Sequence, residues 1–237
     1  TDSPNLRLKP NVHQQNSGYI QWGVEVYGGA LTYTWLDRDL TLAGCVMVRN
    51  IHEPTKPILH MVNLQKPLLR IPSLAIHLNR DVAREGLKLN AQKHMVPIFG
   101  LTDEIATDDL AEEKKGDSLQ RFIGEHLDID PSLIIYWDLS LADVTPPCLG
   151  GNDQVFIFSP RLDNQAMCHA SVMALLETKT QLTQATQLIC LYDHEEVGSH
   201  SSAGAGGTFV EYVMRRITEV EGPGAQPGGI SRASALS

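Results

Sequence analysis

Four residues that could do chemistry stand side by side in this sequence. Asp193, His194, Glu195 and Glu196 directly follow the apolar run 188–192. Carboxylates packed this closely raise each other's pKa, which costs stability unless a positive charge lies between them. A metal ion, or a proton held for catalysis, would supply that charge. Alternatively, the side chains point into solvent at the end of a strand, and the local sequence leaves both interpretations open.

The elements around this cluster predict how it could meet a further carboxylate, Asp163. Two apolar runs are typical of strands covered on both faces, and each precedes a segment with helical periodicity. These segments are residues 155–159, 165–179, 188–192 and 209–217. Their order favours an α/β layer with parallel strands, in which ligands bind beyond the carboxyl ends of the strands. Asp163 follows the first run, and Glu195 and Glu196 follow the second, so neighbouring strands would bring the three carboxylates together.

The first half of the chain has a different pattern. Residues 19–27 alternate apolar and polar side chains, which predicts a half-buried strand, and residues 118–127 carry apolar side chains at helical spacing. The other predictions are strands at 31–36, 40–49, 58–64, 94–100 and 133–142 and a polar loop at 11–17. Asp37 and Asp39 are typical of a turn, and Ser73 could begin a short helix. A break rich in Pro and Gly at 145–151 separates this β-rich half from the half in which strands and helices alternate.

Composition argues against several classes of partner. The formal net charge of −9 disfavours nucleic acid, whose binding needs a basic patch, and no run of about 18 apolar residues offers a membrane span. The four cysteines lie far apart without a CxxC pair, and the sequence shows no signal peptide. We therefore expect a cytoplasmic protein with reduced thiols, no nucleic-acid partner and no membrane association.

Six motifs in a fixed order resemble a known family. They are TDSP at 1–4, GVEVYGG at 23–29, WLDRDLTLAG at 35–44, IPSLAIHL at 71–78, PRLDN at 160–164 and DHEEVGS at 193–199. Together they resemble the aspartyl aminopeptidases, the M18 family of dinuclear zinc exopeptidases. The resemblance covers residues 1–217. Residues 218–237 are rich in Gly, Pro, Ser and Ala, which predicts a disordered tail or sequence foreign to the family.

The resemblance implies roles for the three carboxylates. Asp163 would bridge two zinc ions, because one carboxylate has two oxygens. Glu196 would bind one of the ions directly. Glu195 would be the general base, which takes a proton from the attacking water and later delivers it to the leaving amine. Two zinc ions per active site are implied as the cofactor.

The resemblance also implies roles for Asp2 and His77. Asp2 is similar to the aspartate of the family's His-Thr-Asp-Ser motif, in which the histidine binds zinc and the aspartate orients its imidazole. The sequence begins one residue after the position of that histidine. His77 is similar to a histidine that contacts substrate in a neighbouring subunit's active site. From the residues alone, a structural hydrogen-bonded histidine is the more typical interpretation of His77.

The expected fold is therefore α/β, a parallel-sheet zinc exopeptidase domain, incomplete here, with an inserted β-rich dimerisation domain. The expected segments are 1–4 and 151–217 for the catalytic domain, 5–150 for the inserted domain and 218–237 for the tail. The implied activity is zinc-dependent release of N-terminal Asp or Glu from peptides. The implied partners are such peptides and further copies of the chain, as dimers that assemble into a tetrahedral dodecamer.

Several zinc ligands and the basic group for acidic side chains have no counterpart in the matched residues. Asp163 and Glu196 alone are too few for two zinc sites, since each ion takes about four ligands. We therefore expect the 237-residue chain to be an inactive fragment. The alternative is a non-catalytic self-association module that co-assembles with a full-length peptidase. A weaker alternative is a different co-catalytic zinc hydrolase that acts on another amide.

Overall fold

The computed structural model describes residues 1–102, 118–178 and 186–220. The chain divides into two compact units, one formed by Pro4–Pro160 and the other by Thr1–Ser3 together with Arg161–Ser237. Each unit is described separately below. Within the described ranges, no helix has both the length and the apolar character needed to cross a membrane.

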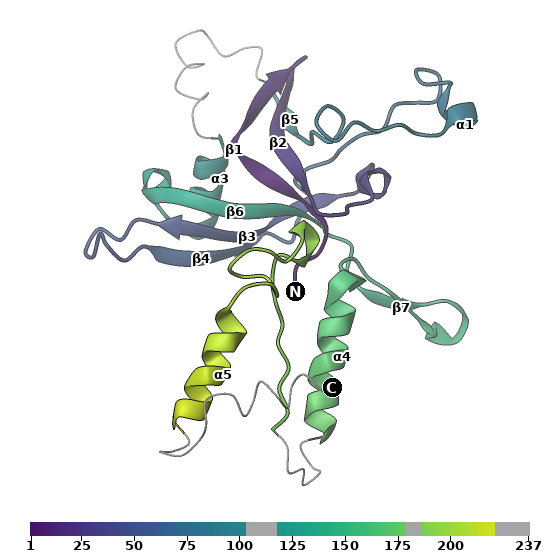
Figure 1. The fold of residues 1–237 in the computed structure, drawn as a ribbon. Helices are drawn as coiled ribbons and strands as arrows, with labels where there is room; N and C mark the ends of the chain where they lie inside the picture. Colours follow the sequence, from purple (N-terminus) through teal and green to yellow (C-terminus); the bar gives the residue numbers. More distant parts are fainter. Residues whose placement is uncertain (103–117, 179–185, 221–237) are drawn as a thin grey trace. The chain divides into compact units, whose positions relative to one another are not determined.

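A six-stranded antiparallel sheet forms the centre of the Pro4–Pro160 unit (Figure 1). Its strands, in spatial order, are β4 (Ile58–Asn63), β3 (Leu40–Val48), β6 (Ile134–Asp143), β1 (Asn5–Asn16), β2 (Tyr19–Tyr27) and β5 (Ile98–Leu101). The unit also contains the helices α1 (Val82–Glu85) and α3 (Ser118–Leu127), and the 3₁₀ turns η1 (Thr32–Trp35), η2 (Pro131–Leu133) and η3 (Asn152–Gln154). Strands from both ends of the unit's sequence meet in the middle of the sheet, where β6 pairs with β1 and β3.

The strand at 19–27 follows its alternating pattern. Trp22 and Val24 face the core, while Glu25 is exposed. The polar segment predicted as a loop at 11–17 instead continues β1 to Asn16. It pairs with β2 through a tight turn in which Ser17 and Gly18 both have positive φ, of 53° and 81°. Such hairpins are determined by their turn and by main-chain pairing. A strand made of polar residues can therefore form without the alternating apolar pattern from which strands are predicted.

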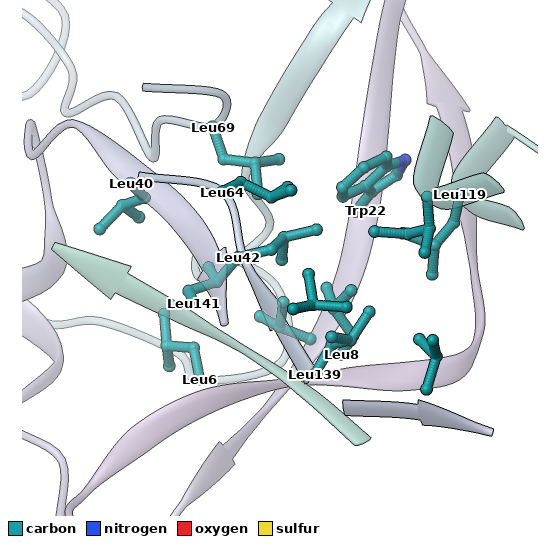
Figure 2. Packing of buried hydrophobic residues seen from close by; sticks show 14 of the residues in the cluster. Leu6, Leu8, Trp22, Leu40, Leu42, Leu64, Leu69, Leu119, Leu139 and Leu141 are labelled. Carbon is teal, nitrogen blue, oxygen red and sulfur yellow. The ribbon is translucent and has the colours of Figure 1, made fainter. Parts of the chain in front are cut away.

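Eighteen buried apolar residues make one core on one face of the sheet, and Figure 2 shows fourteen of them. Leu42, Leu139 and Leu141 project from β3 and β6, and Leu119 reaches the same core from α3. Three aromatic rings pack against one another beside these leucines. The ring of Trp22 stacks on Phe99, with centroids 4.0 Å apart, and both rings meet the edge of Phe122. The helix α3 covers the part of the core that carries Trp22.

The predicted strand at 31–36 is instead the 3₁₀ turn η1, which is followed by Asp37 at a positive φ of 57°. The carboxylate of Asp37 accepts hydrogen bonds from the hydroxyl of Ser73 at 2.6 Å and from its backbone N–H at 3.0 Å. These two hydrogen bonds hold the pKa of Asp37 below its ordinary value, and the bond from the Ser73 hydroxyl has the larger effect. Asp39 pairs with Arg70, with 2.5 Å between Oδ1 and Nη1. The Asp37–Asp39 pair therefore has structural partners at a turn.

The expected parallel-sheet α/β exopeptidase domain is wrong for the described residues, which form mostly antiparallel sheet with few helices. The apolar run at 155–159 contributes β8 (Phe156–Phe158), which pairs antiparallel with β7 (Cys148–Gly150). The side chains of β8 are between 54% and 62% exposed. The run at 188–192 forms no strand. Parallel sheets are stable only when other elements cover both of their faces. An apolar run does not specify which strand it pairs with or which elements cover it.

Within its described residues, the second unit contains two helices and a short turn. These are α4 (Leu162–Thr178), η4 (Glu195–Val197) and α5 (Phe209–Val220), so helices lie at both predicted positions, 165–179 and 209–217. Many apolar side chains of the helices are exposed, among them Met167, Phe209 and Tyr212. Residues 221–237, which include most of the predicted tail, lie outside the described part of the chain.

Candidate metal and catalytic site

Glu195 and Glu196 begin the 3₁₀ turn η4, which follows an extended segment. His194 precedes the turn with a left-handed φ of 60°, and Gly198 ends it with a φ of 95°. The N–H of Gly198 donates to the carbonyl of Glu195 at 3.0 Å, and the N–H of Ser199 donates to that of His194 at 2.9 Å. The chain therefore reverses within a few residues. Glu195 is exposed and Glu196 is half-buried.

Asp2 contacts this turn through both oxygens of its carboxylate. Oδ1 accepts a hydrogen bond from the backbone N–H of Glu195 at 3.0 Å, and Oδ2 accepts one from the N–H of Glu196 at 3.2 Å. Only 8% of the Asp2 side chain is exposed. The structure thus brings together three of the predicted site residues, although by a route the sequence did not indicate. Asp2 was expected to orient an imidazole, whereas here it binds the main chain of the two glutamates.

Asp163 lies at the beginning of α4 with backbone angles outside the helical range, φ −80° and ψ 117°. Its peptide bond to Asn164 is cis, and its side chain is exposed. Two residues further on, Nε2 of Gln165 donates to the carbonyl of Thr1 at 2.6 Å. The hydroxyl of Thr1 in turn donates to the carbonyl of Tyr192 at 2.9 Å. Thr1 therefore connects the start of α4 with the segment that leads to Glu195.

The oxygen donors of Asp163 and Glu196 suit zinc in type, but the described residues supply too few ligands for a complete site. Zinc takes about four ligands from His, Cys, Asp or Glu. Within residues 1–102, 118–178 and 186–220, no three such side chains gather closely enough to hold a metal ion. His194 directs Nδ1 to the hydroxyl of Ser201, 2.6 Å away.

His77 belongs to the Pro4–Pro160 unit, where it lies exposed in the turn 76–78. Leu74, Ile76 and Leu78 around it are also exposed, between 49% and 75%. The contacts of Thr1 and Gln165 could not be predicted from the sequence, because each residue meets its partner across most of the length of the chain.

Comparisons with known proteins match almost the whole chain. A family model described as Aminopeptidase I zinc metalloprotease (M18) matches residues 1–227. Aspartyl aminopeptidase 1 of Schizosaccharomyces pombe is 41% identical over 235 residues, which cover 93% of this chain and 49% of the relative. This chain spans about half the length of the curated relatives it matches.

Solved structures show the same likeness. The structure titled Cryo-EM structure of the Ape4 and Nbr1 complex aligns with a TM-score of 0.81 and 38% identity, over 96% of this chain and 45% of that one. The mApe1 dodecamer of S. cerevisiae aligns with a TM-score of 0.69 and 29% identity, over 91% of this chain and 47% of that one.

Proposed function

This chain belongs to the M18 family of zinc metalloproteases, and from that premise we propose that the whole protein releases N-terminal Asp or Glu from peptides by zinc-dependent hydrolysis. The observation that carries the proposal is the turn η4, where Glu195 and Glu196 follow each other and both N–H groups are held by Asp2. The acidic preference rests on the likeness to aspartyl aminopeptidase 1.

In this proposal Asp163 and Glu196 hold the metal, and Asp163 could contact two ions because its carboxylate has two oxygens. Zinc, when bound, activates a water molecule and polarises the scissile carbonyl. Residues outside this chain would complete the site, since the two carboxylates supply too few of the ligands that zinc needs. His77, on its exposed turn, would contact substrate in a neighbouring copy of the protein.

Glu195 would act as the general base. It is the neighbour of a proposed ligand on a turn whose main chain is hydrogen-bonded, so its carboxylate could lie beside the attacking water without holding the metal itself. An exposed glutamate accepts a proton from the water and passes it to the amine of the leaving peptide. A positioned acid–base group of this kind contributes about 10²–10⁴-fold to the rate.

A peptide series tests the proposal. The whole polypeptide in which these 237 residues occur is assayed with zinc on peptides that differ only in the N-terminal residue. We expect Asp and Glu to be released at least about tenfold faster than other residues, a difference of about 1.4 kcal/mol, and a chelator to stop turnover. Preference for another N-terminal residue would favour the different zinc hydrolase instead. The 237-residue chain alone should show no turnover, because its described residues supply too few zinc ligands.

The second candidate function is self-association, and an apolar area on the outer face of the sheet favours it. Leu59 and Met61 of β4 lie beside Met47 and Cys45 of β3, and Met47 lies beside Tyr136 of β6. Leu59, Met61 and Tyr136 are 57%, 73% and 48% exposed. We call these five residues the outer apolar face. Contiguous exposed apolar side chains of this kind are typical of protein–protein contacts. The similar S. cerevisiae structure is a dodecamer, which makes a second copy the proposed occupant.

Met61→Lys is expected to weaken self-association. A lysine ammonium buried without a partner costs several kcal/mol, so the dissociation constant of the oligomer should rise on the order of a hundredfold. Sedimentation of the 237-residue chain across a concentration series measures this dissociation constant. Leu31→Lys is the matched control, because Leu31 is 60% exposed outside the sheet. Unchanged association in Met61→Lys, with dissociation in Phe158→Lys on the exposed strand β8, would contradict the assignment of this face.

A further inference from the structure

We propose that Asp2 is a positioning residue that fixes the turn carrying Glu195 and Glu196, a role that rests on the proposed function of those two glutamates. The motif resemblance assigned Asp2 to an imidazole. The structure gives each of its oxygens a main-chain partner on the turn, at 3.0 Å and 3.2 Å. The two bonds span 193 and 194 positions of the sequence, so they do not arise from local sequence.

The turn η4 needs an acceptor from outside its own sequence. The first N–H groups of any helical turn have no partner within the turn, and the side chain of the preceding residue usually accepts from them. His194 occupies that position with a left-handed backbone and makes no such hydrogen bond. The carboxylate of Asp2 supplies the acceptors instead. Hydrogen bonds to an ionised group are about twice as strong as neutral ones, and low exposure of Asp2 strengthens them further.

The neighbour of Asp2 extends the connection to the element that carries Asp163. The carbonyl of Thr1 accepts from the side chain of Gln165 in α4, and the Thr1 hydroxyl donates to the carbonyl of Tyr192. Thr1 and Asp2 together therefore touch the chain just before the charge cluster, the turn itself and the first residues of α4. A shift of this two-residue segment would move the main chain beneath the proposed base and at least one proposed metal ligand.

The first arm of the test uses the metal-free 237-residue chain and residue-resolved hydrogen–deuterium exchange. Asp2→Asn keeps the shape of the side chain but offers one acceptor oxygen instead of two. We expect the amides of Glu195 and Glu196 to exchange on the order of tenfold faster, because a bond to a charged acceptor is lost. The amide of His194 donates to Asp193 Oδ1 at 2.9 Å and is the internal control, whose rate should stay unchanged. Amides of β3 report that the sheet stays folded.

The second arm uses the whole polypeptide with zinc. Asp2→Asn is expected to lower kcat, or the affinity for zinc, by about 10–100-fold, as is usual for residues that orient ligands. KM should stay unchanged, because the residues on the turn are proposed to act on the water and the metal and not to hold the peptide in the ground state. Asp2→Glu retains both acceptor oxygens and should restore part of the loss. A change confined to thermal stability, with kcat and zinc affinity unaltered, would overturn the positioning role.

Unchanged exchange at Glu195 and Glu196 in Asp2→Asn would also overturn it. Failure of the proposed function is a separate result, namely wild-type polypeptide that binds no zinc and cleaves no peptide. In that event the exchange measurement still decides whether Asp2 holds the turn, because it requires neither metal nor substrate.

Discussion

Glu195→Gln in the whole polypeptide is expected to lower kcat by about 10²–10⁴-fold, since glutamine cannot accept the proton that the attacking water must lose. Zinc content should stay at the wild-type level, because Glu195 is proposed to bind no metal. Asp163→Asn should lower both kcat and zinc content, since an amide is a poorer ligand than a carboxylate. Steady-state kinetics and metal analysis of the same preparations separate the two roles.

Glu211→Gln is the control for these substitutions. Glu211 is also a glutamate of the Arg161–Ser237 segment, but it lies on α5 and pairs with Arg215 four residues later. Its loss should leave kcat and zinc content unchanged, because exposed pairs of this kind contribute well under about 1 kcal/mol to stability. Wild-type kcat in Glu195→Gln, or lost zinc in the same variant, would contradict the division between base and ligand.

Leu42→Ala is expected to cost about 2–5 kcal/mol of unfolding free energy, which is a large part of the stability of an ordinary domain. Leu42 has no exposed surface and lies on β3, between β4 and β6, directly beside Leu141. Alanine would remove its methyl groups and leave a cavity that the surrounding sheet cannot close. Urea unfolding of the 237-residue chain, followed by tryptophan fluorescence, measures the loss.

Leu101→Ala is the matched control, a leucine in the same sheet that is 69% exposed on the edge strand β5. Its replacement should change the unfolding free energy by less than about 0.5 kcal/mol. Equal losses in the two variants would show that the core assigned to β3 and β6 does not determine stability.

Local patterns predicted those parts of the fold that local forces determine. Trp22 and Val24 alternate with polar residues, and their strand lies where this alternation indicated. The helix α3 covers the predicted residues, because its apolar side chains recur at helical spacing. Pairing partners carry no such signal. The apolar strand β8 was assigned to a parallel sheet, yet it pairs antiparallel with β7, because an apolar run does not determine its neighbour.

The candidate site divides in the same way. Adjacency revealed Glu195 and Glu196, the expected strand order added Asp163, and the family resemblance implied their roles. The bonds from both glutamate amides to Asp2 could not be predicted from the sequence. They depend on how two segments meet that are separated by more than 190 positions. Asp37 shows the converse case. Its turn was predicted from local chemistry, but its partner Ser73 was expected to begin a helix.

The bonds between Asp2 and the η4 turn join residues that are synthesised far apart in time. The buried core residues of the Pro4–Pro160 unit all lie between Leu6 and Leu141, so this core can form before α4 leaves the ribosome. Asp2 is made first of all the proposed site residues, yet its partners arrive last. Residues 4–160 lie in the long loop between them, and closing a long loop costs little more than closing a short one, because the entropic cost grows only with the logarithm of length. The bonds between Asp2 and the turn therefore carry little extra entropic cost for the length of chain that they span.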